Sequence, residues 1–128
     1  MGTIRIHVQK IKREGILFYC VQNRDYTFDK ERPLTTFEHL TKDDGGESEH
    51  LDHYKDFVHF VNKKYGEEAK KHIEKLIETD NRIHFHVWDA YTLRDFFARA
   101  QQHLDYSFSI EYFAESGNEC AFIIRKVV

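Results

Sequence analysis

The sequence predicts an α/β layer protein, with a small mixed sheet, flanking helices and a C-terminal antiparallel hairpin. Two observations support this fold class. Apolar residues alternate with polar ones near both ends of the chain, and they recur every three to four positions in the middle. The chain has 128 residues, of which 41% are hydrophobic. This length suits one domain, which we expect to span residues 1–128.

The N-terminal part of the chain predicts two strands. Ile4, Ile6 and Val8 alternate with polar residues, which is typical of a half-buried strand over residues 3–10. Residues 10–14 fit either a turn or the end of a short helix. Residues 16–21 form a continuous apolar run, which favours a strand covered on both faces in a mostly parallel sheet.

The middle of the chain predicts a loop followed by two helices. Residues 23–48 are polar and contain the only proline, Pro33, so we expect a long polar loop. From Glu49 the apolar positions step by three and four, which predicts one helix ending near Gly66 and another over residues 67–78.

The last third predicts an extended segment, a helix and a hairpin. Residues 82–88 alternate, which places His84 and His86 on one face. Either Asp89 or Thr92 can cap the helix that follows. Alternation over residues 106–113 and 119–128, with a turn at residues 115–118, predicts the closing hairpin.

Composition excludes several functions. Nineteen basic and 22 acidic residues leave a net charge of −3, which argues against nucleic acid as a partner. No apolar run is long enough to predict a membrane span. Cys20 and Cys120 lack metal-ligand spacing, so we expect free thiols and a cytoplasmic location. The six glycines form no Gly-X-Gly pair, so the sequence has no dinucleotide fingerprint.

Two histidine pairs are candidates for chemistry. His84 and His86 share one face of the extended segment, and His50 and His53 are three apart on a predicted helix. The three acidic residues that could complete a zinc-type site with them are Glu38, Asp52 and Asp89. We favour the alternative interpretation, in which one pair is hydrogen-bonded in a cleft and the other is solvated. We therefore expect no metal.

Several segments resemble one enzyme superfamily. Residues 11–21, with Lys12 and Gly15, are similar to the fifth strand of class I S-adenosylmethionine-dependent methyltransferases and the turn before it. Arg13, Glu14 and Gln22 depart from that pattern. Residues 24–40 resemble an insertion found in a bacterial subgroup of methyltransferase-domain proteins. Residues 83–88, 111–113 and 117–119 resemble other segments of the same subgroup. The resemblance covers nearly all of residues 11–126.

The resemblance implies a partial Rossmann-like methyltransferase fold, whose seventh strand lies beside the fifth in an antiparallel hairpin with the sixth. It implies the C-terminal half of such an enzyme, without the N-terminal half that binds the cofactor. We therefore expect no S-adenosylmethionine binding and no catalysis by the isolated chain. In a complete enzyme the partner would be a small-molecule acceptor. Candidate acceptor-binding or general-base residues are then Arg32, Glu38, His39, His84 and His86.

Two expectations follow for partners and function. The strand at residues 16–21 would have an open edge, which either the predicted strand at residues 3–10 covers or a second copy pairs with in a homodimer. The chain is expected to be a methyltransferase-like domain that is inactive alone. The alternative is a small histidine-rich module that binds a metal, an anion or a protein.

Overall fold

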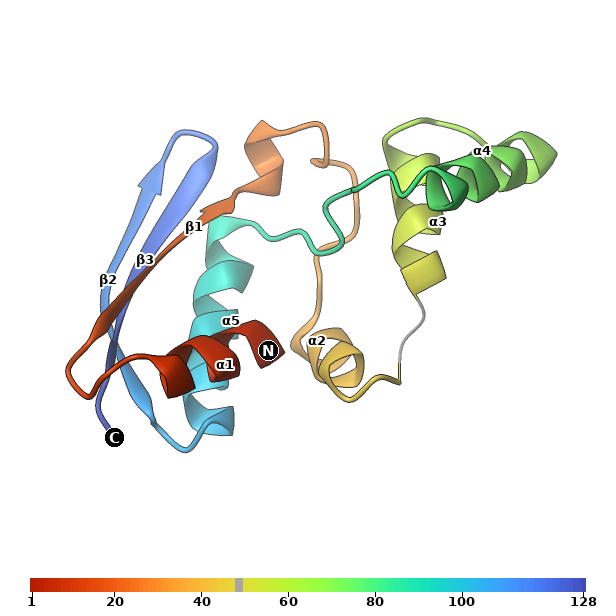
Figure 1. The fold of residues 1–128 in the computed structure, drawn as a ribbon. Coiled ribbons are helices and arrows are strands. Elements are labelled where there is room, and N and C mark those ends of the chain that lie inside the picture. Colours follow the sequence, from red (N-terminus) through yellow and green to blue (C-terminus); the bar gives the residue numbers. More distant parts are fainter. Residues whose placement is uncertain (48–49) are drawn as a thin grey trace.

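The computed structural model describes residues 1–47 and 50–128 (Figure 1). It is a mixed α/β structure in which the helices precede or interrupt the strands along the chain. The elements in chain order are α1 (Gly2–Lys10), β1 (Ile16–Gln22), a 3-10 turn (Arg24–Tyr26), α2 (Phe37–Asp44), α3 (His50–Phe60), α4 (Gly66–Glu78), α5 (Ala90–His103), β2 (Phe108–Ser116) and β3 (Glu119–Lys126). None of the helices within these described residues has the length and apolar character needed to cross a membrane.

The sheet is antiparallel rather than mixed. Within the described residues it has three strands in the order β1-β3-β2, and β3 pairs antiparallel with both neighbours. The predicted C-terminal hairpin is confirmed, and it turns at Gly117, whose φ of 60° is readily adopted only by glycine. Its second strand lies beside β1. Residues 16–21 are therefore a strand, as predicted, but not part of a parallel sheet.

The predicted N-terminal strand is wrong, because residues 2–10 form helix α1. Ile4 and Val8 are four positions apart, so they share one face of a helix, and both are buried. Ile6, which should share their face in a strand, is 54% exposed. A strand at residues 3–10 therefore cannot cover the edge of β1, and within the described chain β1 pairs with β3 alone.

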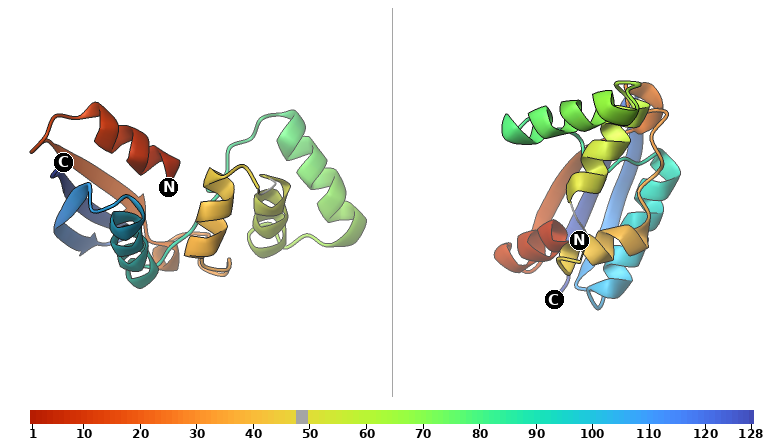
Figure 2. Two further views of the ribbon diagram at one scale, coloured as in Figure 1. Left: turned by 90° about the horizontal axis from the view of Figure 1, so that it is seen from below. Right: turned by 90° about the vertical axis from the view of Figure 1, so that its right-hand side faces the viewer.

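Helices α1 and α5 lie along one face of the sheet (Figures 1 and 2). We call this part the sheet body: α1, the three described strands and α5. Its core includes the stacked rings of Phe97 and Phe122, with centroids 4.0 Å apart. The opposite face of the sheet carries Ile16 and Phe18, which are 57% and 65% exposed. The expected burial of β1 on both faces is therefore wrong.

Helices α3 and α4 form a second unit, the helical arm (residues 50–78). It projects away from the sheet, with α2 between the two parts (Figures 1 and 2). Tyr54, Val58 and Leu76 form its own small apolar cluster. The structure confirms helices close to those predicted, although α3 ends at Phe60 rather than near Gly66. The predicted start of this helix at Glu49 lies outside the described residues.

The predicted loop at residues 23–48 is partly helical. It contains the 3-10 turn and helix α2, and the Thr36 side chain caps α2 by accepting from the backbone N–H of His39. The last residue of the predicted loop, Ser48, lies outside the described residues. A helix in this region matters for function, because it fixes the spacing of polar side chains.

Residues 82–88, predicted as an extended segment, form neither a helix nor a strand of the sheet. They run beside residues 23–35, with one parallel bridge between Asn23 and Trp88. Thr35 makes two hydrogen bonds to Val87. The Thr35 hydroxyl accepts from the backbone N–H of Val87, and the backbone N–H of Thr35 donates to the carbonyl of Val87. Asp89 then caps α5 in a reciprocal capping box with Thr92.

Candidate metal centre

Helix α2 brings two polar side chains to one face. His39 and Asp43 are four positions apart, so both project from the same side of the helix. Leu40, between them, is buried in the core of the sheet body and fixes the rotation of α2. As a result, His39 Nε2 lies 3.4 Å from Asp43 Oδ2.

Two further imidazoles reach the same carboxylate from other segments. His53 comes from α3, where its ring is buried and stacks on Phe85 with centroids 5.0 Å apart. Its Nε2 lies 3.4 Å from Asp43 Oδ2. His86 comes from the irregular segment before α5, and its Nε2 lies 2.5 Å from the same oxygen.

These four residues, which we call the histidine cluster (His39, Asp43, His53 and His86), lie close enough together that they could ligate one metal ion. One donor atom from each lies within 4.8 Å of all the others. A tetrahedral zinc ion with bonds of about 2.0–2.1 Å would hold its donor atoms about 3.3 Å apart. The two 3.4 Å separations already match this spacing, and His86 would exchange its contact with Asp43 for a metal bond.

The electrostatics of the cluster favour neutral imidazoles. Burial is the main cause that lowers the pKa of His53 and of His86, and Asp43 opposes it. For Asp43, burial acts to raise the pKa, but the His86 hydrogen bond and the neighbouring imidazoles outweigh it and lower the pKa. Neutral imidazole and ionised carboxylate are the forms that bind a metal ion.

Asp43 also has an unused acceptor. Its Oδ1 is buried, and no donor among the described residues bonds to it. A buried carboxylate oxygen without a partner is costly, so such atoms call for an explanation. A metal ion, or a water bound to one, would supply the missing interaction.

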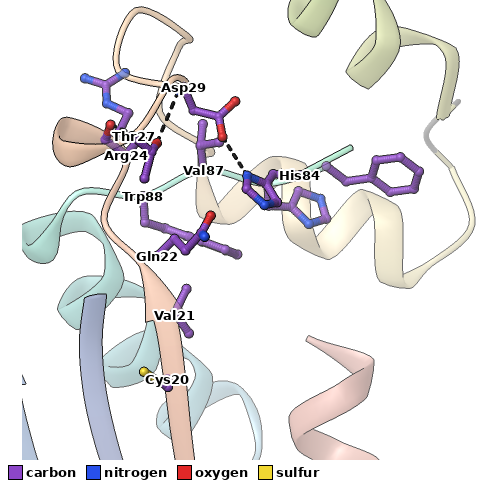
Figure 3. Close-up of a pocket in the computed structure, with 11 residues that line it drawn as sticks. Cys20, Val21, Gln22, Arg24, Thr27, Asp29, His84, Val87 and Trp88 are labelled. Carbon is purple, nitrogen blue, oxygen red and sulfur yellow. Dashed lines mark hydrogen bonds and ion pairs between the residues drawn. The ribbon is translucent and has the colours of Figure 1, made fainter. Parts of the chain in front are cut away.

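His84 belongs to a different group from His86. Its Nδ1 lies 2.7 Å from Asp29 Oδ2, and the Asp29 carboxylate also pairs with buried Arg32. Arg32 in turn donates to the backbone carbonyls of His84 and Phe85. Figure 3 shows the Asp29–His84 pair in the wall of a pocket of about 310 Å³ beside the end of β1.

The structure brings together only some of the residues named from the sequence. His39, His53 and His86 meet, whereas His84 lies against Asp29. His84 and His86 line the same pocket beside β1, but each pairs with a different carboxylate, Asp29 for His84 and Asp43 for His86. Within the described chain, Glu38 is exposed and pairs with Arg99. His50 packs against Phe85 and lies outside the cluster, and Arg32 is a buried structural group.

Sequence reasoning missed Asp43, the residue at the centre of the cluster. The only signal was its spacing of four from His39, which has no meaning in a segment interpreted as a loop. Of the acidic residues named instead, Asp52 forms an ion pair with Lys55 and Asp89 caps α5. A scan against protein-family models and searches of curated proteins and of solved structures found no match to this chain.

Proposed function

We propose that this chain binds a divalent transition metal ion, with zinc as the best candidate, through His39, Asp43, His53 and His86. The observation that carries the proposal is the convergence of four donor atoms within 4.8 Å from three separate segments. This is the metal version of the histidine-rich binding module expected as an alternative from the sequence, with a different ligand set.

The donor set selects the class of metal. Three imidazoles suit zinc and its neighbours in the first transition row, whereas magnesium and calcium prefer oxygen ligands. Zinc accepts three nitrogen donors and one carboxylate oxygen in a tetrahedral site.

A bound ion would join the helical arm to the sheet body. His39 and Asp43 belong to α2, which is anchored in the body core through Leu40, whereas His53 belongs to the arm. The ion binds only when these segments are folded together, so its binding free energy adds to the stability of that arrangement. A role in holding the fold together is therefore the simplest consequence.

Zinc titration of the metal-free chain by calorimetry at pH 7.5 tests the proposal. We expect one zinc ion per chain. Asp43→Asn and His53→Ala should each weaken binding by at least about tenfold. His59→Ala is the matched control, because His59 is an exposed residue on the same helix as His53 and should leave affinity unchanged. Equal affinity in all four proteins, with folding checked by circular dichroism, would contradict the proposal.

We also propose a relationship to the C-terminal half of a methyltransferase-like fold. Its support is the strand order β1-β3-β2, in which the second hairpin strand lies antiparallel beside the strand at residues 16–22. That is the order which the resemblance implies for the fifth, seventh and sixth strands. In this proposal the chain supplies residues for a small-molecule acceptor and does not bind the methyl donor.

A calorimetric titration with S-adenosylmethionine tests this second candidate. We expect no heat of binding from the chain alone, with or without zinc. Micromolar affinity would contradict the proposed absence of a donor site. The zinc titration above is independent of this result, so each candidate can fail without the other.

A further inference from the structure

The pocket beside the end of β1 has the size and the walls of a small-molecule site (Figure 3). Its volume of about 310 Å³ lies at the lower end of the range for ligand pockets, about 300–1,000 Å³. Apolar surface predominates in its wall, with contributions from Val21, Phe85, Val87 and Trp88. A small ring could bury its apolar surface against this wall.

One polar group of the wall, the imidazole of His84, is held in a fixed orientation. Its Nδ1 lies 2.7 Å from Oδ2 of Asp29, a residue that is only 1% exposed. The other carboxylate oxygen of Asp29 accepts from Nη1 of buried Arg32 at 2.9 Å. Phe28 stacks on the imidazole, with ring centroids 5.4 Å apart and an angle of 11° between the ring planes. The imidazole cannot turn over without breaking its hydrogen bond to Asp29.

The same contacts decide which nitrogen of His84 carries the proton. A carboxylate only accepts hydrogen bonds, so His84 Nδ1 donates to Asp29. In a neutral imidazole only one nitrogen is protonated, which leaves a lone pair on Nε2. This nitrogen has no hydrogen-bond partner among the described residues, and the His84 side chain is 41% exposed. The pocket wall therefore offers a hydrogen-bond acceptor to a ligand.

We propose that this pocket binds a small, flat heteroaromatic molecule whose edge carries an N–H that donates to His84 Nε2. The ring would lie against the apolar wall that Val21 and Trp88 help to form. Because His84 is partly exposed, the hydrogen bond should contribute about three- to tenfold in affinity, as one ordinary hydrogen bond does. The inference goes beyond both proposed functions and rests on neither, since Asp29 and His84 supply no donor atom to the histidine cluster.

Two probes of almost the same shape test the ligand class. Indole has an N–H where benzofuran has an oxygen atom. The full chain, kept metal-free by a chelator, is titrated with each probe at pH 8.0, and ¹H–¹⁵N NMR spectra report where and how tightly it binds. We expect indole to bind about three- to tenfold more tightly, and both probes to shift the amide signals of Val21 and Trp88. The proposal is wrong if neither probe binds, if their affinities are equal, or if the shifted signals come only from other parts of the chain.

Two variants test whether His84 and its protonated nitrogen set the preference for indole. His84→Phe keeps a flat ring but removes the acceptor, so indole should bind no better than benzofuran. Asp29→Asn should abolish the preference too, because its amide NH₂ would donate to Nδ1 while its oxygen stays with Arg32, which moves the proton to Nε2.

His59→Phe is the matched control, because His59 is an exposed residue on α3, and it should retain the preference. The same spectra show whether each variant is folded. A preference for indole that survives in either folded variant at position 84 or 29 would assign the binding to other groups and overturn the proposal. The outcome does not depend on the zinc titration, so the ligand and the metal proposals can fail separately.

Discussion

The sheet body and the helical arm are held together by different forces. The body has a continuous apolar core in which α1 and α5 pack on the inner face of the sheet, and Leu40 of α2 is buried against it. The arm has a smaller apolar cluster between α3 and α4. Where the two parts meet, buried or half-buried polar groups lie close together: the histidine cluster and the Asp29–Arg32 pair. Apolar packing stabilises each part, and the arm is joined to the rest of the chain both by these polar groups and by aromatic contacts such as Tyr54–Phe85 and Phe28–Phe57.

This difference explains where the candidate site lies. Apolar packing is not directional, so it tolerates small shifts between elements. Hydrogen bonds and metal bonds require specific distances, so they fix one arrangement of the arm against the body. If the proposed metal ion binds at this junction, it would help to hold that arrangement.

The largest expected effect comes from the core of the body. Phe122→Ala removes a ring that is 1% exposed and stacked on Phe97, so it should lower the free energy of unfolding by about 3–5 kcal/mol. Urea denaturation measures the change. Phe18→Ala, on the outer face of the same sheet, is the matched control and should cost about 0.5 kcal/mol. Equal losses would mean that the two faces are not buried as described.

Breaking the polar contacts between the sheet body and the helical arm should lower the free energy of unfolding somewhat less. The effect should appear in the arm and not in the sheet. Arg32→Met leaves Asp29 with only the His84 imidazole as a side-chain partner, so we expect a loss of about 3 kcal/mol, at the lower end for a broken buried pair. Hydrogen exchange should show lost protection in α3 and α4, with β2 and β3 still protected. Arg82→Met is the control, since Arg82 is exposed. Uniform loss of protection would refute the separation into two parts.

The metal-free protein should lose stability on acidification. Burial lowers the pKa of His53 and His86 in the folded state, so the unfolded chain binds more protons. Stability is therefore full above the ordinary histidine pKa of about 6.5 and falls as the pH drops below it. Thermal unfolding from pH 7.5 to 5.5 measures this. His86→Gln should flatten the dependence, and an unchanged slope would exclude the cluster as its source.

The smallest effect on stability should come from the open edge of the sheet. β1 has no charged residue, and two of its apolar side chains, Ile16 and Phe18, are exposed. We expect pairs of chains to associate through this edge at high concentration. Phe18→Lys should change the free energy of unfolding by no more than about 0.5 kcal/mol but reduce association in sedimentation experiments. Monomeric behaviour of the unmodified chain at all concentrations would end the homodimer proposal.

The sequence predicted the elements that carry strong local signals. The hairpin alternates over two long segments joined by Gly117, and α5 carries its own capping residues at Asp89 and Thr92. Helix α1 was missed because Ile4 and Val8 fit both a strand and a helix face, and only packing against the body decides between them. Helix α2 was missed because Leu40 is its one buried residue among mostly polar neighbours.

The candidate site was predictable only in parts. His53 and His86 stood out as members of histidine pairs, and the family resemblance pointed to His39. Asp43 could not be found, because its role depends on a helix that lacks a strong apolar pattern. Nothing local brings residues 39, 53 and 86 together, since their contact depends on how three distant segments fold onto one another. The pairing of His84 with Asp29 is long-range for the same reason.

The short distance along the chain between His86 and Asp89 has a mechanical consequence. His86 belongs to the histidine cluster, and Asp89 caps the helix whose side chains fill the body core. A pull on the arm would therefore reach the first turn of α5 through three peptide units. The force needed to unfold the protein by pulling would then depend on whether an ion is bound to His86. This would hold although the core of the sheet body contains none of the cluster's donor atoms.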